Sequence, residues 1–207
     1  MKAQRINKAR ERACGAASMK NIAIMGFKCC GKTAVAKALA KRMGKQFIDL
    51  DNIIMEIHAG EKDEKLSCRE IHEKYGAEYF RSLEAKAVEE LAGKTSRVIA
   101  LGGGTVAYNA NAGMLKKHCT LVYLKDSPER LLERIKERGI PAFLDANDLE
   151  GSMKRELARR EPLYGKYADI EIDGAELKIG EIIEELYRLL KRGGYGKGKG
   201  FIKKKSG

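Results

Sequence analysis

The sequence has no tryptophan, three prolines and only 6% aromatic residues, and it contains no long hydrophobic run. Its longest apolar stretches, 21–27 and 97–101, have the length of a strand, whereas a membrane-spanning helix needs about 20 apolar residues. The first twenty residues also lack the apolar stretch of a secretory signal. These absences argue against a membrane protein, and we expect the chain to act in the cytoplasm.

Cysteine and histidine are scarce, and neither is spaced as a metal site or a disulfide framework would require. The five cysteines are odd in number and include no C-x-x-C pair. The three histidines are scattered along the chain without the spacing of metal ligands. We therefore expect reduced thiols and no zinc site.

Acidic side chains are nearly absent from both ends of the chain, whose formal net charge is +12. Residues 1–20 carry Glu11 among six basic side chains, and residues 191–207 carry seven basic side chains and no acidic one. The stretch between them is neutral, unlike a nucleic-acid-binding domain, whose basic patch lies on the folded surface. We expect no specific nucleic acid partner, although the basic ends can touch polyanions non-specifically.

The rest of the composition is typical of a globular domain, with 43% hydrophobic and 34% charged residues. We expect one folded domain over 20–191, flanked by a basic leader over 1–19 and a Gly- and Lys-rich tail over 192–207. Neither flank can bury apolar area, so both are expected to be disordered. We also expect the protein to be a monomer.

Strand-like and helix-like patterns alternate along this domain. Short apolar runs predict strands, and apolar residues at spacings of three and four predict helices. This alternation is typical of an α/β fold, in which helices cover both faces of a parallel sheet. The expected strands are 21–25, 46–50, 97–101, 119–124 and 169–172, and the expected helices are 33–43, 51–58, 67–74, 77–91, 110–117, 128–138, a basic helix ending at 160, and 181–190.

The segment 26–33, GFKCCGKT, fits the phosphate-binding motif G-x-x-x-x-G-K-[ST] and lies between an expected strand and an expected helix. Its glycines allow backbone N–H groups to surround phosphate oxygens, and the start of the helix adds a favourable dipole. Lys32 should reach the β- and γ-phosphates, and Thr33 should offer its hydroxyl to Mg²⁺. The motif therefore predicts binding of a nucleoside triphosphate, with contacts from Gly26, Cys29, Cys30, Gly31, Lys32, Thr33 and Ala34.

Two carboxylates, Asp49 and Asp51, stand at the carboxyl end of the second expected strand. The period of a strand directs both to the same side, and this edge of an open α/β sheet is where ligands bind. By themselves they allow a plain alternative, in which Asp51 caps a helix and Asp49 is solvated. Beside a phosphate-binding loop, roles in metal and substrate binding become the better interpretation.

Five motifs occur in one order: the loop 26–33, Asp49-x-Asp51, 80–84 (FRSLE), 101–104 (LGGG) and 160–164 (REPLY). In this combination the chain resembles the shikimate kinases from about residue 20 to 190. The resemblance implies a P-loop three-layer sandwich with a five-stranded parallel sheet of order 2-3-1-4-5 and a mobile lid over about 139–150. It also implies transfer of phosphate from ATP, with Mg²⁺, to the 3-hydroxyl of shikimate, a step of the chorismate pathway to aromatic amino acids.

The resemblance implies a role for each matching residue. Asp49 lies near Mg²⁺ together with Thr33, and Asp51 accepts hydrogen bonds from substrate hydroxyls and orients the attacking one. Arg81 and Arg160 clamp the substrate carboxylate, because a guanidinium pairs with a carboxylate bidentately. The implied catalytic residues are Lys32, Asp49 and Asp51, and the implied substrate-binding residues are Asp51, Arg81, Gly103, Gly104 and Arg160.

The lid departs from the family pattern. The shikimate kinases usually carry an arginine before the lid proline, whereas this chain has Ile140 before Pro141. Arg138, Lys154 or Arg155 could replace that charge, and the sequence does not choose among them. Three alternatives follow: another kinase of the same fold, such as a gluconate or nucleotide kinase, a catalytically weak binding protein, or a protein that binds nucleic acid through its basic ends.

Overall fold

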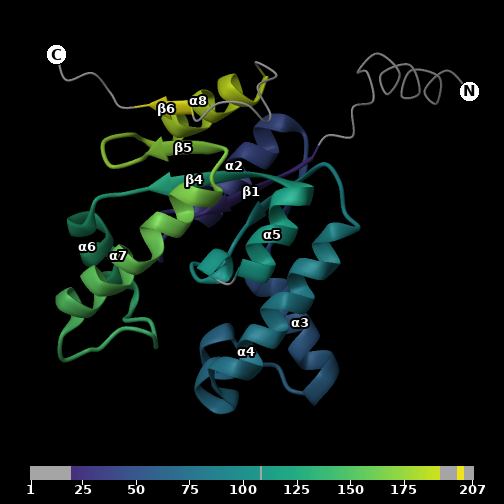
Figure 1. The fold of residues 1–207 in the computed structure, drawn as a ribbon, viewed down its shortest axis with the longest axis vertical. Coiled ribbons are helices and arrows are strands. Elements are labelled where there is room, and N and C mark those ends of the chain that lie inside the picture. The colour runs from purple at the N-terminus through teal and green to yellow at the C-terminus, as the bar shows by residue number, and fades with distance from the viewer. Residues whose placement is uncertain (1–19, 108, 192–199, 203–207) are drawn as a thin grey trace, which may run out of the picture.

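A computed structural model of the chain describes residues 20–107, 109–191 and 200–202, and Figure 1 shows its fold. The expected leader, 1–19, and most of the expected tail, 192–199 and 203–207, lie outside the described residues. The strands form one parallel sheet of order β2-β3-β1-β4-β5-β6. The order of the first five strands confirms the predicted 2-3-1-4-5 topology.

The secondary structure follows the expected alternation closely. The strands are β1 (Asn21–Met25), β2 (Gln46–Asp49), β3 (Arg97–Ala100), β4 (Cys119–Lys125), β5 (Ile170–Asp173) and β6 (Gly200–Ile202). The helices are α2 (Lys32–Met43), α3 (Leu50–Lys62), α4 (Cys68–Ala92), α5 (Asn109–His118), α6 (Pro128–Arg138), α7 (Leu149–Tyr167) and α8 (Ile179–Lys191), with a short 3₁₀ helix, η1, at Thr105–Ala107.

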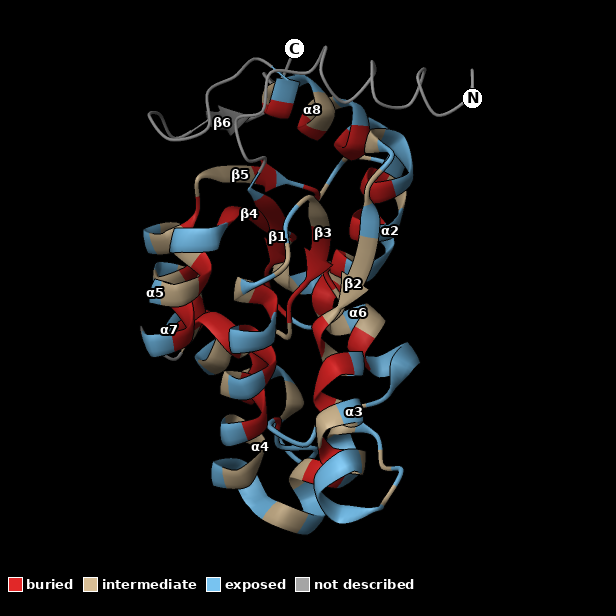
Figure 2. Cartoon of the chain, turned by 90° about the vertical axis from the view of Figure 1, so that its right-hand side faces the viewer, coloured by how far each residue is buried: buried red, intermediate tan, exposed pale blue. Residues whose placement is uncertain are grey.

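Two hydrophobic clusters cover the two faces of the sheet (Figure 2). Successive residues of β1 point to opposite faces, so Ile22 and Ile24 join one cluster while Ala23 and Met25 join the other. Helices α2, α6 and α8 contribute to the first cluster, and α3, α4 and α5 contribute to the second. Because β1 is buried on both faces at the centre of the sheet, the loop after it starts from a rigid position.

The break expected at Gly76 is confirmed: this residue has non-helical torsion angles (φ 83, ψ 171) and divides α4 into two helical parts. Two other local features depart from the expected elements. Helix α7 runs past Arg160 to Tyr167 and contains Pro162. Proline removes one intrahelical bond, which would go to the carbonyl of Ala158, and that residue is exposed to water. Finally, β6 pairs with β5 inside the segment 192–207 that we expected to be disordered.

Residues 139–150, the lid segment, connect α6 to α7 and contain no regular helix or strand before Leu149. Pro141 O accepts a hydrogen bond from Leu144 N at 3.0 Å, and Leu144 is buried against the first hydrophobic cluster. In the part of the chain that the structure describes, no helix is long and apolar enough to cross a membrane.

Candidate active site

The phosphate-binding loop takes a shape that only certain residues can adopt. Gly26 follows β1 with φ +149, and a Cβ built on it would lie 2.4 Å from the carbonyl oxygen of Leu124 in β4. Gly31 has φ +97 and forms the N-cap of α2. Cys29 also has a positive φ, 66°, which is uncommon for a residue with a side chain. The loop is thus folded tightly over the end of β1 and directly precedes the N-terminus of a 12-residue helix.

Lys32 folds back onto this loop. Its Nζ donates to the carbonyl oxygen of Phe27 at 2.7 Å and lies 3.8 Å from the Cys30 sulfur, and the residue is buried. The pKa of the Cys30 thiol is raised chiefly by burial, so this sulfur is a packing group and not a nucleophile. The ammonium charge of Lys32 therefore stands inside the loop, beside backbone N–H groups at the start of α2.

Thr33 and Asp49 are brought together from two different elements. The hydroxyl Oγ1 of Thr33, in the first turn of α2, donates to Asp49 Oδ2 at 3.2 Å. Asp49 is also the N-cap of α3, since its Oδ1 accepts a hydrogen bond from the backbone N–H of Asp51 at 3.2 Å. The plain alternative therefore assigned the cap to the wrong residue: Asp49 makes it, and the Asp51 carboxylate remains available to a ligand.

Asp51 lies deeper in the site. Burial raises the pKa of its carboxyl group, and the nearby charge of Asp49 raises it further, while the charges of Lys28 and Lys32 oppose the rise. A half-buried carboxylate with a raised pKa beside a phosphate-binding loop is suited to accept a proton or a hydrogen bond from a hydroxyl group.

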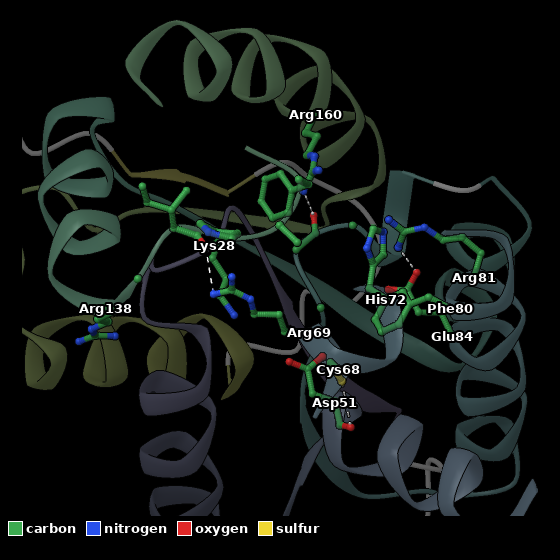
Figure 3. Close-up of a pocket in the computed structure, with 18 residues that line it drawn as sticks. Lys28, Asp51, Cys68, Arg69, His72, Phe80, Arg81, Glu84, Arg138 and Arg160 are labelled. Carbon is green, nitrogen blue, oxygen red and sulfur yellow. Dashed lines mark hydrogen bonds and ion pairs between the residues drawn. The ribbon is translucent and has the colours of Figure 1, made fainter. Parts of the chain in front are cut away.

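A cavity of about 260 Å³ opens between the phosphate-binding loop, α4, the glycines after β3 and the lid segment (Figure 3). The predicted substrate residues Asp51, Arg81, Gly103, Gly104 and Arg160 all line it. The position of a Cβ on Gly103 would be 3.4 Å from the backbone nitrogen of Lys28, so the cavity adjoins the phosphate-binding loop directly. A donor phosphate on the loop and an acceptor in the cavity would be neighbours.

Arg81 is held by a buried carboxylate. Its Nη1 pairs with Glu84 Oε2 one turn later on α4, and the Glu84 side chain is only 2% exposed. The other carboxylate oxygen of Glu84 accepts a hydrogen bond from the Thr105 hydroxyl at 3.0 Å. A Cβ on Gly104 would lie 3.0 Å from Arg81 Nη1, so the absence of a side chain there makes room for the guanidinium. Arg81 is thereby fixed with its charge at the cavity wall.

Arg160 is fixed in a similar way on the opposite side. It is buried in α7, and its Nε and Nη2 contact Glu156 Oε2 at 2.8 and 2.6 Å. Its Nη1 lies 3.4 Å from the carbonyl oxygen of Gly103, which also accepts a 2.5 Å hydrogen bond from the hydroxyl of Tyr164. The extension of α7 beyond Arg160 places Tyr164 for this bond. The two arginines thus converge on the cavity from α4 and α7.

The lid segment closes one side of the cavity with apolar side chains. The Phe143 ring lies 4.3 Å from the guanidinium carbon of Arg160 and meets the Phe27 ring edge-on at 6.1 Å between centroids. Ile140 and Pro141 line the same wall, and the sequence 139–150 contains no basic residue. The three residues that could replace a lid arginine lie in different surroundings. Arg138 lines the cavity, whereas Lys154 pairs with Glu150 and Arg155 pairs with Asp148.

All predicted site residues lie around this one site, although their individual roles remain predictions. The predicted site residues leave out several side chains that line the cavity, among them Lys28, Arg69, His72 and Phe143. Lys28 stood inside the recognised motif, at a position where any residue is allowed. Arg69 and His72 are separated by three positions at the start of α4 and face the cavity together, a helical spacing that the sequence did display.

Each kind of comparison with known proteins finds shikimate kinases. The family model described as shikimate kinase matches residues 28–191. A shikimate kinase of Caldanaerobacter subterraneus is 38% identical over 170 residues, which covers 82% of this chain and 95% of that protein. One of Thermoanaerobacter pseudethanolicus is 37% identical, covering 84% and 100%. The structure of shikimate kinase from Acinetobacter baumannii in complex with shikimate superposes with a TM-score of 0.78 at 26% identity, covering 86% of this chain and 96% of that one.

Proposed function

The chain belongs to the shikimate kinase family, and we propose that it transfers the γ-phosphate of ATP to the 3-hydroxyl of shikimate. One observation supports this function above the others. The cavity lined by Asp51, Arg81 and Arg160 adjoins the backbone of the phosphate-binding loop, so an anionic alcohol in the cavity would lie next to a nucleotide phosphate on the loop. Phosphoryl transfer depends mainly on such positioning and on charge stabilisation.

The loop fits a nucleotide phosphate. The space that a Cβ on Gly26 would fill is needed for the tight turn, and the left-handed Cys29 and Gly31 orient the backbone ahead of α2. Lys32 and the N–H groups of the loop would hold the β- and γ-phosphates, with Ala34 in the first turn of the helix. The charge of Lys32 stabilises negative charge that spreads over the phosphate oxygens during transfer.

Thr33 and Asp49 fit Mg²⁺ bound together with nucleotide phosphate. Both offer oxygen atoms, 3.2 Å apart, and among the described residues no group of three or more His, Cys, Asp or Glu forms a protein-only metal cage. This small donor set is what Mg²⁺ uses when phosphates and water complete its coordination. When bound, Mg²⁺ would supply a charge that neutralises the phosphate oxygens.

Side chains of positive and of negative charge would hold the acceptor. Arg81 and Arg160 would clamp the carboxylate of shikimate, since each guanidinium lines the cavity and is already oriented by a glutamate. Asp51 would accept a hydrogen bond from the attacking hydroxyl and turn its oxygen toward the phosphate. Gly103 and Gly104 let the ring of the acceptor approach the backbone.

The other kinases of this fold are not favoured. Both the family model and the curated relatives are shikimate kinases, and the intact pair Asp49 and Asp51 argues against a protein that only binds its ligands. Ile140 is the feature that favours the alternatives, because it stands where the family usually has an arginine whose charge stabilises the transition state.

The proposal is tested by release of ADP from Mg·ATP, measured in a coupled assay with shikimate, quinate or gluconate as acceptor. Shikimate-dependent release that exceeds release with the other two is the expected result. Release with gluconate or quinate alone would assign another acceptor. If ATP binds but no acceptor stimulates release, Ile140→Arg becomes the informative variant, because restored activity would show that only the lid charge was missing.

A further inference from the structure

The cavity is bounded by two parts of the chain that are far apart in sequence. Helices α3 and α4 supply one wall, and the lid segment with Arg160 supplies the other. The lid segment has two acidic residues before α7, Asp145 and Asp148, and no basic residue. Any positive charge that meets the lid segment must therefore come from a neighbouring element.

Arg69 connects the α4 wall of the cavity to the lid segment. Its guanidinium Nη1 lies 3.5 Å from the carbonyl oxygen of Ile140, and its Nε donates to Glu73 Oε1 at 2.8 Å. In Figure 3 the side chain extends from α4 toward Lys28 and the lid segment, whereas Arg138 points away from the other arginines. The Ile140 carbonyl sits between Gly139, with φ +99, and Pro141, so the contact falls at the start of the lid segment.

The backbone that carries Arg69 is anchored to the acceptor site. Ser67 begins α4 with a capping box, in which its side chain accepts from Glu70 N and its own N–H donates to Glu70 Oε2 at 2.8 Å. The thiol of Cys68, adjacent to Arg69, lies 3.5 Å from the carbonyl oxygen of Asp51. A shift of α4 on acceptor binding would therefore move the backbone of Arg69.

We propose that Arg69 is a positioning residue that couples occupation of the acceptor cavity to closure of the lid segment. It acts by donating to the Ile140 carbonyl, and it thereby links α4 to the lid at the position where the lid lacks a charge of its own. The proposal rests on the proposed function, because the cavity it closes is the acceptor cavity. The side chain is 62% exposed, so the expected effect is moderate.

The absence of tryptophan from the sequence provides a direct probe of the lid. Phe143→Trp creates a sole tryptophan that lies against Arg160 and Phe27. Its emission is titrated with shikimate in the presence of Mg²⁺ and a non-hydrolysable ATP analogue, in the full chain with and without Arg69→Met. We expect the concentration for half of the emission change to rise about three- to tenfold with Arg69→Met, the range of one lost hydrogen bond.

Steady-state kinetics without the probe give a second measurement. Arg69→Met should raise the KM for shikimate by the same factor and change kcat less, because the closed state is less populated and the reacting groups are intact. Arg69→Lys, which keeps one donor, should recover part of the loss. Glu73→Gln is the matched control: it breaks the ion pair of Arg69 and leaves the guanidinium, so it should leave both measurements unchanged.

Two outcomes would overturn the inference. Equal titrations for the parent and the Arg69→Met protein would remove any role in closure, and an equal loss with Glu73→Gln would show that Arg69 only stabilises α4. If Arg69→Met does not fold, Arg69→Gln is measured in its place. Failure of the proposed function is separate, since it would appear as no shikimate-dependent ADP release from the unaltered chain.

Discussion

Asp51 sits where its burial and the charge of Asp49 both oppose ionisation, which raises the pKa of its carboxyl group. In the unfolded chain the same group ionises at its ordinary pKa. As the pH rises from the ordinary pKa to the raised pKa, Asp51 loses its proton in the unfolded state before it does so in the folded state. The ionised Asp51 therefore lowers the free energy of unfolding at neutral pH. The residue that we propose to orient the acceptor therefore lowers the stability of the fold.

Asp51→Asn should increase the free energy of unfolding at neutral pH while it removes shikimate-dependent activity. The gain should be absent below the ordinary pKa of aspartate, should grow as the pH rises from that value to the raised pKa, and should stay constant above it. Denaturant unfolding of both proteins between pH 3 and 8 measures it, with exposed Glu89→Gln as a control that should show no such gain. A gain independent of pH would contradict the argument.

Lys32→Ala should lower kcat by about 100-fold or more, because its ammonium group lies inside the phosphate-binding loop, where Nζ donates to Phe27 O. The measurement is steady-state ADP release at saturating shikimate. Lys41→Ala, an exposed residue on the same helix, is the matched control and should keep normal turnover. Unchanged turnover in Lys32→Ala would refute the assigned role.

Arg81→Ala should mainly raise the KM for shikimate, by about tenfold or more, the cost of losing a charged hydrogen-bond partner. It should also lower the melting temperature, since the buried Glu84 would keep only its bond to Thr105. Kinetics and thermal unfolding of the same sample separate the two effects. A fall in kcat at unchanged KM would place Arg81 in the transfer step instead of in acceptor binding.

At the scale of elements, two glycines test whether close packing against β4 fixes the phosphate-binding loop. Gly26 is crowded by neighbouring atoms, and Gly60 is not. Gly26→Ala places a Cβ 2.4 Å from Leu124 O at φ +149, so we expect about 2 kcal/mol or more of lost stability and weaker ATP binding. Gly60→Ala, in α3 with no atom within 4 Å and no positive φ, should gain about 0.5 kcal/mol. Denaturant unfolding gives both values, and a loss in both proteins would reject the steric argument.

The sequence predicted elements best where local chemistry decides them. The helix predicted over 128–138 is α6, whose start is set locally by Ser127 as N-cap and Pro128 at the first position. The continuation of α7 through Pro162 was not predicted; it is accompanied by a tertiary contact, the Tyr164 hydroxyl on Gly103 O, which no local pattern encodes. The cap of α3 by Asp49 depended on where the strand ended. Arg69 was not predicted as a site residue because its hydrogen-bond partner, the carbonyl of Ile140, is distant in sequence.

At the scale of the whole molecule, the parallel sheet explains why distant motifs form one site. Strands β1, β2 and β3 are neighbours, so their carboxyl ends bring the phosphate-binding loop, Asp49 and the glycines after Leu101 to one edge. The family resemblance supplied the strand order, which composition alone could not give. The sixth strand, β6, was not predicted because its Gly- and Lys-rich surroundings carry no strand signal.

The distribution of charge leads to the last prediction. Residues 21–190 carry equal numbers of acidic and basic side chains, so the whole net charge of +12 lies in the two ends. The full chain should therefore bind RNA at low salt without sequence preference, and this binding should weaken steeply as salt rises. A chain of residues 20–191 should lose the binding and keep its activity, because it retains both hydrophobic clusters and the whole cavity.

Filter binding of RNA at several salt concentrations, beside ADP release from the same two proteins, measures this prediction. Salt-sensitive binding that persists in the 20–191 chain would locate the interaction in the folded domain, where Lys28, Arg69 and Arg138 line the cavity. Competition by Mg·ATP and shikimate would then decide the matter, since only RNA bound at the cavity would be displaced. Loss of activity on truncation would instead mean that the tail strand β6 supports β5 and the site beyond it.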